Sequence, residues 1–328
     1  MTVSGVSTAP AALAPLLNFT YITHVMKRLT ICSAILVSVL ASPSFAQLGM
    51  FTPEQRIAIT SEWKGERFPD GRPKVPDEVL QRLAHTTAEE AWGTLRKHGY
   101  KLQFEGNWKT LNVKPGERLV GRAVTVQFVP LRPDLNNYIN EQGKKENRVG
   151  RGQNSWVIST LAKGDVMVVD LYGKVKDGTI IGDNLGTSMM AKTGTGLVVN
   201  GAVRDPSGLS EIEGFKIFTR DFDPSAIADT TLLGWNIPIR IGQATVLPGD
   251  IVLSDPDGIT FIPAQLAQEV ADDSELTQLR DDWGHTMLRE QKYNPGQIDA
   301  QWTPAMIEEF NRWAAAKGSK LQMKSPNE

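Results

Sequence analysis

The residues best suited to chemistry lie between Gly182 and Asp205. Asp183 precedes a short helical segment, and twenty residues separate it from the pair Arg204-Asp205, which follows a short apolar segment. A guanidinium can bind a carboxylate or keto oxygen through two N–H donors, and a carboxylate can hold a hard divalent cation. These residue types fit a small α-keto acid whose enolate is stabilised by a Lewis-acidic cation when a carbon–carbon bond breaks.

Each residue of this set has an expected role. Arg204 would bind the carboxylate or keto oxygen of the keto acid, and Asp205 would hold the cation. Asp183 would position or deprotonate a water molecule, while the backbone amides of Asn184 and Leu185 would donate from the helix N-terminus to the other carboxylate oxygen. The alternative is purely structural: Asp183 is only a helix N-cap, and Arg204-Asp205 is an ordinary surface pair.

Other catalytic motifs fail on order or composition. Gly194-Thr195-Gly196 follows a helix and precedes a strand, which is the reverse of the order found in dinucleotide-binding loops. The segment 186–193 has Ala191 where a phosphate loop needs glycine. The chain has no Gly-x-Ser-x-Gly or His-Glu-x-x-His motif, so His285, which lies near two aspartates, is the one histidine kept as a secondary candidate.

The elements that must position these residues can be read from the hydrophobic pattern. A helix over about 184–193 and a buried strand over 196–200 run out and back, so the loops before and after them meet at one edge of a sheet. Further strands are expected at 119–129, 165–170, 215–219 and 251–262. Asp255 and Asp257, in the turn of the last segment, are expected to cap that turn.

Helical patterns flank this β-rich region. Thr52-Pro53 begins the first, Pro76 opens an amphipathic run that closes at Gly99, and Pro263 starts a long helix toward Gln291. Thr303-Pro304 caps the last helix. We therefore expect an α/β fold in four parts: a leader with signal peptide (1–46), a helical N-terminal extension (47–117), an α/β core (118–275) and a helical C-terminal arm (276–328).

Composition and the N-terminal leader indicate which partners the protein does not bind and where it is located. The 328 residues include 35 Lys and Arg against 37 Asp and Glu, and this balance argues against general nucleic-acid binding. Lys27-Arg28, the apolar run 29–40 and Ser44-Phe45-Ala46 are typical of a secretory signal peptide, because the run is shorter than the ~20 residues of a membrane span. We expect cleavage after Ala46, no membrane contact afterwards, and a periplasmic or secreted protein; a membrane-anchoring helix is the alternative.

Four segments together resemble the RraA-like family, named for the regulator of ribonuclease activity A, which includes 4-hydroxy-4-methyl-2-oxoglutarate aldolases. They are 121–126, 164–170, 182–205 and 248–263, and the resemblance covers about 118–275. It implies a swivelling β/β/α domain. It also implies a homotrimer or homohexamer in which a neighbouring subunit closes each site.

The resemblance also assigns roles residue by residue. It implies that Arg204 binds pyruvate, that Asp205 is a ligand of Mg²⁺ or Mn²⁺, and that Asp183 orders the catalytic water. The amides of Asn184 and Leu185 are implied as carboxylate donors. An acidic residue from the C-terminal helix of the adjacent subunit completes the family's site, and the candidates here are Glu269, Glu275, Asp281 and Asp282. Asn200 departs from the family, which commonly has aspartate at that position.

The expected function is a class II type pyruvate aldolase, a carbon–carbon lyase that depends on a divalent metal. It would cleave a 4-hydroxy-2-oxo acid through a metal-stabilised enolate and release pyruvate. The same enolate would serve the decarboxylation of oxaloacetate. Two alternatives stay open: a non-catalytic protein-binding ring like the ribonuclease regulators, and a Schiff-base aldolase that uses Lys163 or Lys192.

Overall fold

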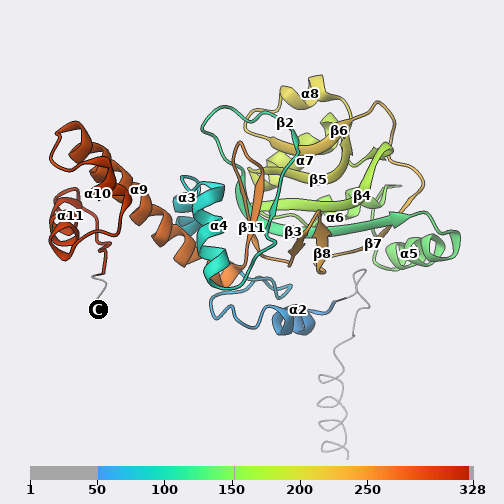
Figure 1. Ribbon diagram of the computed structural model, residues 1–328. Coiled ribbons are helices and arrows are strands. Elements are labelled where there is room, and N and C mark those ends of the chain that lie inside the picture. Colours follow the sequence, from blue (N-terminus) through green and yellow to red (C-terminus); the bar gives the residue numbers. More distant parts are fainter. Residues whose placement is uncertain (1–50, 151, 325–328) are drawn as a thin grey trace, which may run out of the picture. The chain divides into compact units, whose positions relative to one another are not determined.

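A nine-stranded mixed sheet carries the candidate residues (Figure 1). The computed structural model describes residues 51–150 and 152–324, so the expected leader 1–46 lies outside the described residues. The sheet has the order β1-β11-β10-β3-β4-β5-β6-β2, and β7 pairs with β3. The strands are β1 (Phe104–Glu105), β2 (Lys109–Leu111), β3 (Val120–Pro130), β4 (Asp165–Thr179), β5 (Gly196–Val203), β6 (Lys216–Phe222), β7 (Thr230–Trp235), β10 (Ile251–Ser254) and β11 (Ile259–Ile262). A separate hairpin pairs β8 (Ile239–Ile241) with β9 (Ala244–Val246).

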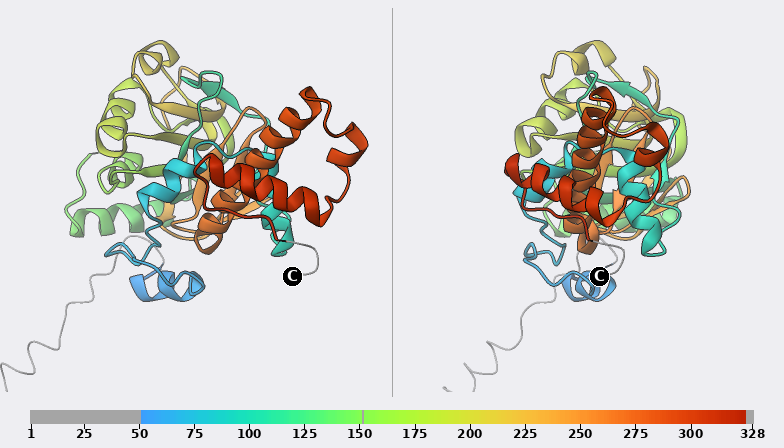
Figure 2. Two further views of the ribbon diagram at one scale, coloured as in Figure 1. Left: turned by 90° about the vertical axis from the view of Figure 1, so that its left-hand side faces the viewer. Right: turned by 60° about the vertical axis from the view of Figure 1, so that its left-hand side comes forward.

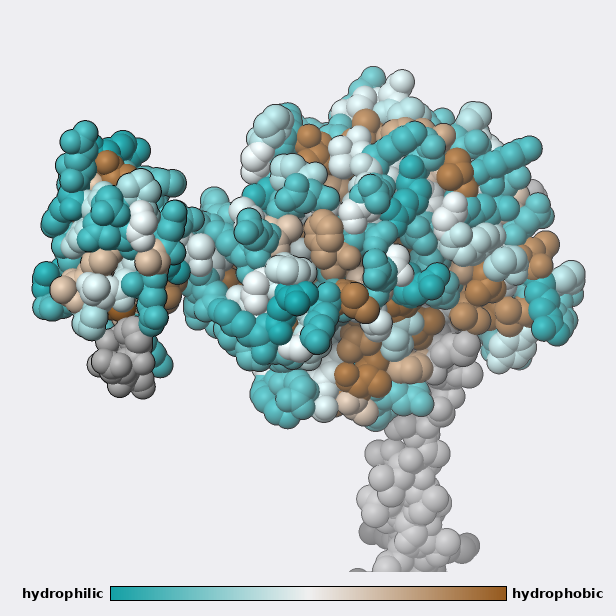
Figure 3. Space-filling view, in the orientation of Figure 1, coloured by the Kyte–Doolittle hydropathy of each residue, from teal (hydrophilic) through white to brown (hydrophobic). Residues whose placement is uncertain are grey.

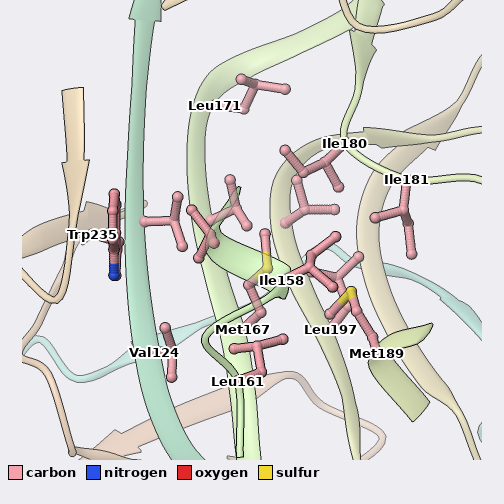
Figure 4. Packing of buried hydrophobic residues seen from close by; sticks show 14 of the residues in the cluster. Val124, Ile158, Leu161, Met167, Leu171, Ile180, Ile181, Met189, Leu197 and Trp235 are labelled. Carbon is pink, nitrogen blue, oxygen red and sulfur yellow. The ribbon is translucent and has the colours of Figure 1, made fainter. Parts of the chain in front are cut away.

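The centre of the sheet is parallel and buried on both faces. β3, β4, β5 and β6 pair in parallel, and residues 121–126 of β3 are all buried. On one face, Val124, Met167 and Leu197 come from three neighbouring strands and meet Ile158 and Met189 from two helices (Figure 4). The opposite face carries a second cluster from the same strands, which packs against the β8–β9 hairpin and β11. Two-sided burial explains the near-continuous apolar runs of these strands.

The two ends of the sheet are joined by three residues, because β1 and β2 are consecutive in the chain and terminate the strand order. Arg220 of β6 donates to the Gly106 carbonyl (2.9 Å) and forms an ion pair with Glu105 (2.6 Å). Its guanidinium carbon lies 3.9 Å from the centre of the Trp108 ring. These contacts curl the sheet into a half-barrel.

Ten α-helices are described, and most of the expected ones are confirmed. They are α2 (Pro53–Ile59), α3 (Asp77–Leu83), α4 (Ala88–Lys97), α5 (Pro133–Lys145), α6 (Gln153–Ile158), α7 (Asp183–Thr193), α8 (Pro206–Ser210), α9 (Ala267–Arg289), α10 (Pro295–Asp299) and α11 (Pro304–Ala316). The single amphipathic helix expected up to Gly99 is wrong, because the chain forms α3 and α4 instead. Thr87 and Glu90 form a capping box that begins α4 anew.

The C-terminal arm has its own small core. The first half of α9 packs on α3 and α4, where Arg82 pairs with Asp272 and Glu275 (both 2.6 Å). Beyond it, α10 and α11 fold back on α9 (Figure 2) and bury Trp283, Trp302 and Phe310. Much of the visible surface of this arm is hydrophilic (Figure 3). Among the residues that the structure describes, no helix is both long and apolar enough to cross a membrane.

The β10–β11 hairpin begins beside a buried carboxyl group. Asp250 is only 4% exposed and accepts a hydrogen bond from the Leu247 N–H (2.8 Å). Burial raises the pKa of Asp250 to about 7 from its ordinary value of 3.8. In the same hairpin, Asp255 accepts from the N–H groups of Asp257 and Gly258, so its expected role in capping the turn is confirmed.

The Asp250 shift predicts how stability depends on pH. The pKa of Asp250 is higher in the folded state than in the unfolded state. Its contribution to the free energy of unfolding is therefore complete below pH 4 and is lost as the pH rises through about 7. The slope for this group can reach about 1.4 kcal/mol per pH unit. Urea unfolding at pH 5 and pH 8 should therefore show a flatter pH dependence for Asp250→Asn than for the wild type. Equal slopes for the two proteins would contradict the assignment.

Candidate active site

Asp183, Arg204 and Asp205 meet at the carboxyl edge of the parallel strands, as the spacing predicted. β4 and β5 are parallel neighbours; α7 begins at Asp183 shortly after β4, and Arg204 directly follows β5. The Arg204 N–H donates to the Ile181 carbonyl (3.0 Å). This bond ties the end of β5 to the turn that starts α7, so the two loops share one edge.

Two glycines allow the charged side chains to come close together. A Cβ placed on Gly182 would lie 2.4 Å from Asp205 Oδ2 and 3.2 Å from Arg204 Nε. A Cβ on Gly208 would lie 2.9 Å from the Asp183 Cβ. At distances below 3.0 Å one of the two atoms must move, so glycine at both positions is what lets the backbone approach the acids without displacing them.

Asp205 has an unusual backbone conformation. Its φ of 55° and ψ of 50° place it in the left-handed region, which aspartate and asparagine enter more readily than other residues that carry a Cβ. Its side chain makes no capping bond to α8, and its Oδ2 lies 3.6 Å from an Arg204 Nη. The side chains of Arg204 and Asp205 are 43% and 44% exposed, so both are accessible to a ligand.

The start of α7 bears on the structural alternative for Asp183. The N-cap residue is Gly182, so Asp183 is not the cap but the first residue of the helix. Its Oδ1 accepts from the Asn184 N–H (2.8 Å), which therefore cannot donate to a ligand until Asp183 turns away. No acceptor within the described ranges is bonded to the Leu185 N–H, which leaves that amide available at the positive end of the helix.

The lysines considered for Schiff-base chemistry lack the environment that it needs. Lys192 is exposed on α7 and donates to the Ser159 carbonyl (3.2 Å), and Lys163 is exposed in the loop before β4. An amine becomes a nucleophile at neutral pH when it is desolvated or lies beside another cation. Neither lysine is desolvated.

A row of polar side chains that the sequence did not reveal crosses the sheet. Asn200 donates to Asp170 (3.0 Å) and accepts from Arg220 (3.0 Å), and Gln127 donates to the other Asp170 oxygen (3.0 Å). An aspartate at position 200 would place a second carboxylate against Asp170, whereas the asparagine bonds to both neighbours. The position of Asp170 at the end of an apolar run could have indicated its place in this row. No comparable sequence feature pointed to Arg220.

The candidate acids of the C-terminal helix fall into two groups. Glu269 bonds to His98 (2.8 Å) and Glu275 pairs with Arg82, so both are engaged within their own subunit. Asp281 and Asp282 are exposed on the second half of α9. His285, the secondary candidate, is exposed on the same helix.

Comparison with known proteins gives one family. The model of the family described as "RraA-like: Aldolase/RraA" matches residues 78–261, so the match starts within the segment expected to be an N-terminal extension. Over 141 residues the chain is 35% identical to a Halalkalibacterium halodurans protein named "Putative 4-hydroxy-4-methyl-2-oxoglutarate aldolase", covering 41% of this chain and 65% of that protein. Over 195 residues it is 28% identical to Protein DlpA of Legionella pneumophila, covering 58% and 28%. The chain thus spans less than two thirds of each relative.

Solved structures agree on the fold. RraAS2 of Streptomyces coelicolor, described as an unusual member of the RNase ES inhibitor RraA protein family, matches with a TM-score of 0.54 and 25% identity. That match covers 65% of this chain and 98% of RraAS2. An uncharacterised Pseudomonas syringae protein matches with a TM-score of 0.52 and 23% identity, covering 70% and 100%. The expected α/β fold, with its helical C-terminal extension, is confirmed.

The close approach at Gly182 predicts the effect of a single methyl group. Gly182→Ala should displace the Asp205 carboxylate with little loss of stability, because the end of a short side chain yields more easily than backbone. Gly93→Ala is the matched control: a Cβ there meets nothing within 4 Å, and alanine should stabilise α4 by about 0.5–1 kcal/mol. Crystal structures and melting temperatures of both variants test this. An unmoved Asp205 in Gly182→Ala would contradict it.

Proposed function

Because this chain belongs to the RraA-like family, we propose that it is a divalent-metal-dependent pyruvate aldolase that cleaves a 4-hydroxy-2-oxo acid. The observation that carries the proposal is the convergence of Asp183, Arg204 and Asp205 around Gly182 at one edge of the sheet. A guanidinium, two exposed carboxylates and a helix N-terminus supply the groups that a keto acid and a hard cation require.

The residues present fit Mg²⁺ or Mn²⁺. Among the residues that the structure describes, no cluster of three or more His, Cys, Asp or Glu could hold a metal ion. Mg²⁺, however, is commonly bound by one or two carboxylates together with water and substrate oxygens. Asp205 would hold the ion, since its carboxylate is half exposed and lies against a glycine that leaves room beside it. When bound, the ion supplies Lewis-acid stabilisation of developing negative charge.

The side chains then divide the reaction between them. Arg204 binds the keto-acid carboxylate with the N–H groups that face away from Asp205, and the Leu185 amide donates to the same ligand. Asp183 holds the water that takes the proton of the 4-hydroxyl group. The C3–C4 bond then breaks, its electron pair forms the pyruvate enolate, and a proton returned through the same water gives pyruvate. Decarboxylation of oxaloacetate would reach the same enolate.

We also propose an oligomeric assembly and a cellular location for the protein. In a homotrimer or homohexamer, Asp281 or Asp282 of one subunit is free to complete the site of its neighbour, since both are exposed. The partner in solution would be a small keto acid, with neither nucleic acid nor membrane involved. The expected signal peptide would place the protein in the periplasm or outside the cell.

The alternative is a non-catalytic ring that binds another protein. The description of RraAS2 as a member of an inhibitor family favours it. The presence of both acids and the arginine at one edge supports the enzyme instead, because protein binding requires no such set.

Bidentate binding of the keto acid by the Arg204 guanidinium predicts a graded loss of activity when this residue is replaced. Arg204→Lys keeps the charge but loses the planar pair of donors, and a charged hydrogen bond contributes about 1.5–3 kcal/mol, so kcat/KM should fall at least tenfold. Arg204→Ala should lose more, while Lys192→Ala should stay within about twofold of the wild type. A coupled assay of pyruvate release measures all three. Full activity in Arg204→Lys would argue against bidentate binding.

Metal dependence separates the proposed aldolase from a Schiff-base enzyme. Asp205→Ala should abolish the activity that Mg²⁺ or Mn²⁺ restores after EDTA treatment, and borohydride should trap no pyruvate adduct on the wild type. Pyruvate release with and without EDTA, followed by mass spectrometry of the borohydride-treated protein, checks both results. Metal-independent turnover in Asp205→Ala, or an adduct on any lysine, would overturn the metal-dependent mechanism.

A further inference from the structure

A polar cavity opens near the end of β3, at the carboxyl edge of the parallel strands. It has a volume of about 150 Å³ and is lined by residues of α5 and α6, the end of β3 and the segment before β7. Four of its lining residues carry amides: Asn136, Asn140, Gln153 and Asn154. Within residues 51–150 and 152–324, its lining includes no charged side chain.

The hydrogen bonds of Gln153 fix the direction of two other amides. The Leu232 N–H can only donate, and it donates to Gln153 Oε1 (2.6 Å). Gln153 Nε2 must then be the donor to the Oδ1 atoms of Asn136 (2.9 Å) and Asn140 (3.0 Å). Both asparagines therefore have their oxygen occupied, and each keeps an NH₂ group for which the described residues provide no acceptor.

Asn154 supplies the opposite polarity. It is 6% exposed and its Nδ2 donates to the Ile180 carbonyl (2.6 Å), so its Oδ1 is left as an acceptor. A Cβ on Gly152 would lie 2.4 Å from that oxygen. Glycine at position 152 therefore leaves the Asn154 oxygen uncovered.

Asn154 links the cavity to the segment that leads into the candidate active site, because its Nδ2 donates to the Ile180 carbonyl. Gly182 is two residues further along the chain, within about 7 Å at full extension. The next carbonyl, that of Ile181, accepts from the Arg204 N–H (3.0 Å). Helices α6 and α7 are in contact, and each leads into one of the parallel neighbours β4 and β5, so both begin near the carboxyl edge of the sheet.

We propose that this amide cavity holds the distal half of the aldol substrate, the half that leaves as an aldehyde, and that this half is uncharged and hydroxylated. The inference rests on the proposed function. Hydroxyl groups both donate and accept, which matches two NH₂ donors and one carbonyl acceptor. A carboxylate only accepts, so it would leave Asn154 Oδ1 unpaired. The volume equals roughly five waters at ~30 Å³ each, enough for a three-carbon hydroxyaldehyde.

The substrate class is then a 2-oxo acid with hydroxyl groups at C4, C5 and C6. Cleavage of the C3–C4 bond moves the 4-hydroxyl proton to water and leaves glyceraldehyde in the amide cavity, with pyruvate at Arg204. A site built to bind hydroxyl groups discriminates strongly against analogues without them, because its polar groups then stay unpaired.

The test compares two aldols on three proteins. The first aldol, 4,5,6-trihydroxy-2-oxohexanoate, has a neutral tail; the second, 4-hydroxy-4-methyl-2-oxoglutarate, ends in a carboxylate. The wild type should prefer the neutral tail at least tenfold in kcat/KM. Asn140→Asp keeps the oxygen that Gln153 needs but replaces the NH₂ donor, so it should lose at least tenfold on the neutral tail. Oxaloacetate decarboxylation should stay within about twofold. Asn137→Asp, on the exposed side of α5, is the matched control and should change none of these rates.

Binding provides a readout that does not depend on turnover. Ligand-observed NMR with glyceraldehyde should show binding to the wild type and to Asn137→Asp, and weaker binding to Asn140→Asp at an unchanged melting temperature. If no aldol is cleaved but this pattern holds, the lyase function fails and the cavity assignment stands. A wild-type preference for the carboxylate tail, unchanged rates in Asn140→Asp, or no glyceraldehyde binding to the wild type would overturn the proposal.

Discussion

The hydrogen bond from the Arg204 N–H to the Ile181 carbonyl is the contact on which the candidate site depends. It extends the parallel pairing of β4 and β5 past the point where the strands end. A guanidinium, an aspartate in the left-handed region and the first turn of α7 are thereby held at one edge, although the chain between them runs down a helix and back up a strand. The three charged side chains are exposed, so their positions come from the backbone and not from packing around them.

The backbone can hold them because the strands beneath are buried on both faces. Residues of β3, β4 and β5 alternate between two apolar clusters, so a shift in register would move large side chains into the wrong cluster. The row from Gln127 through Asp170 and Asn200 to Arg220 adds directional bonds across the same strands. Polar side chains in a half-buried row are tolerated only when each one finds a partner, and these do.

Features encoded by nearby residues could be predicted from the sequence. The spacing from Asp183 to Arg204 gave the shared sheet edge, and Thr303-Pro304 gave the start of α11. The Thr87–Glu90 capping box was also visible, but the apolar stripe from Val79 to Leu95 concealed the break before it. Long-range contacts could not be predicted: Gln153 and Leu232 fix amide orientations across 79 residues, and Arg220 reaches back to Gly106. The bond between Asp183 and the Asn184 amide depends on a rotamer, which a residue pattern does not specify.

The junction between β1 and β2 has a consequence for how this chain behaves beside other copies of itself. Both ends of the strand order are very short, two residues in β1 and three in β2, and the Gly106 and Asn107 carbonyls between them are bonded to Arg220. Long unpaired strand edges recruit strands from other molecules and start aggregation. At these two ends the curled sheet offers a neighbouring molecule only a few free backbone groups, so strand-by-strand growth has almost no template there.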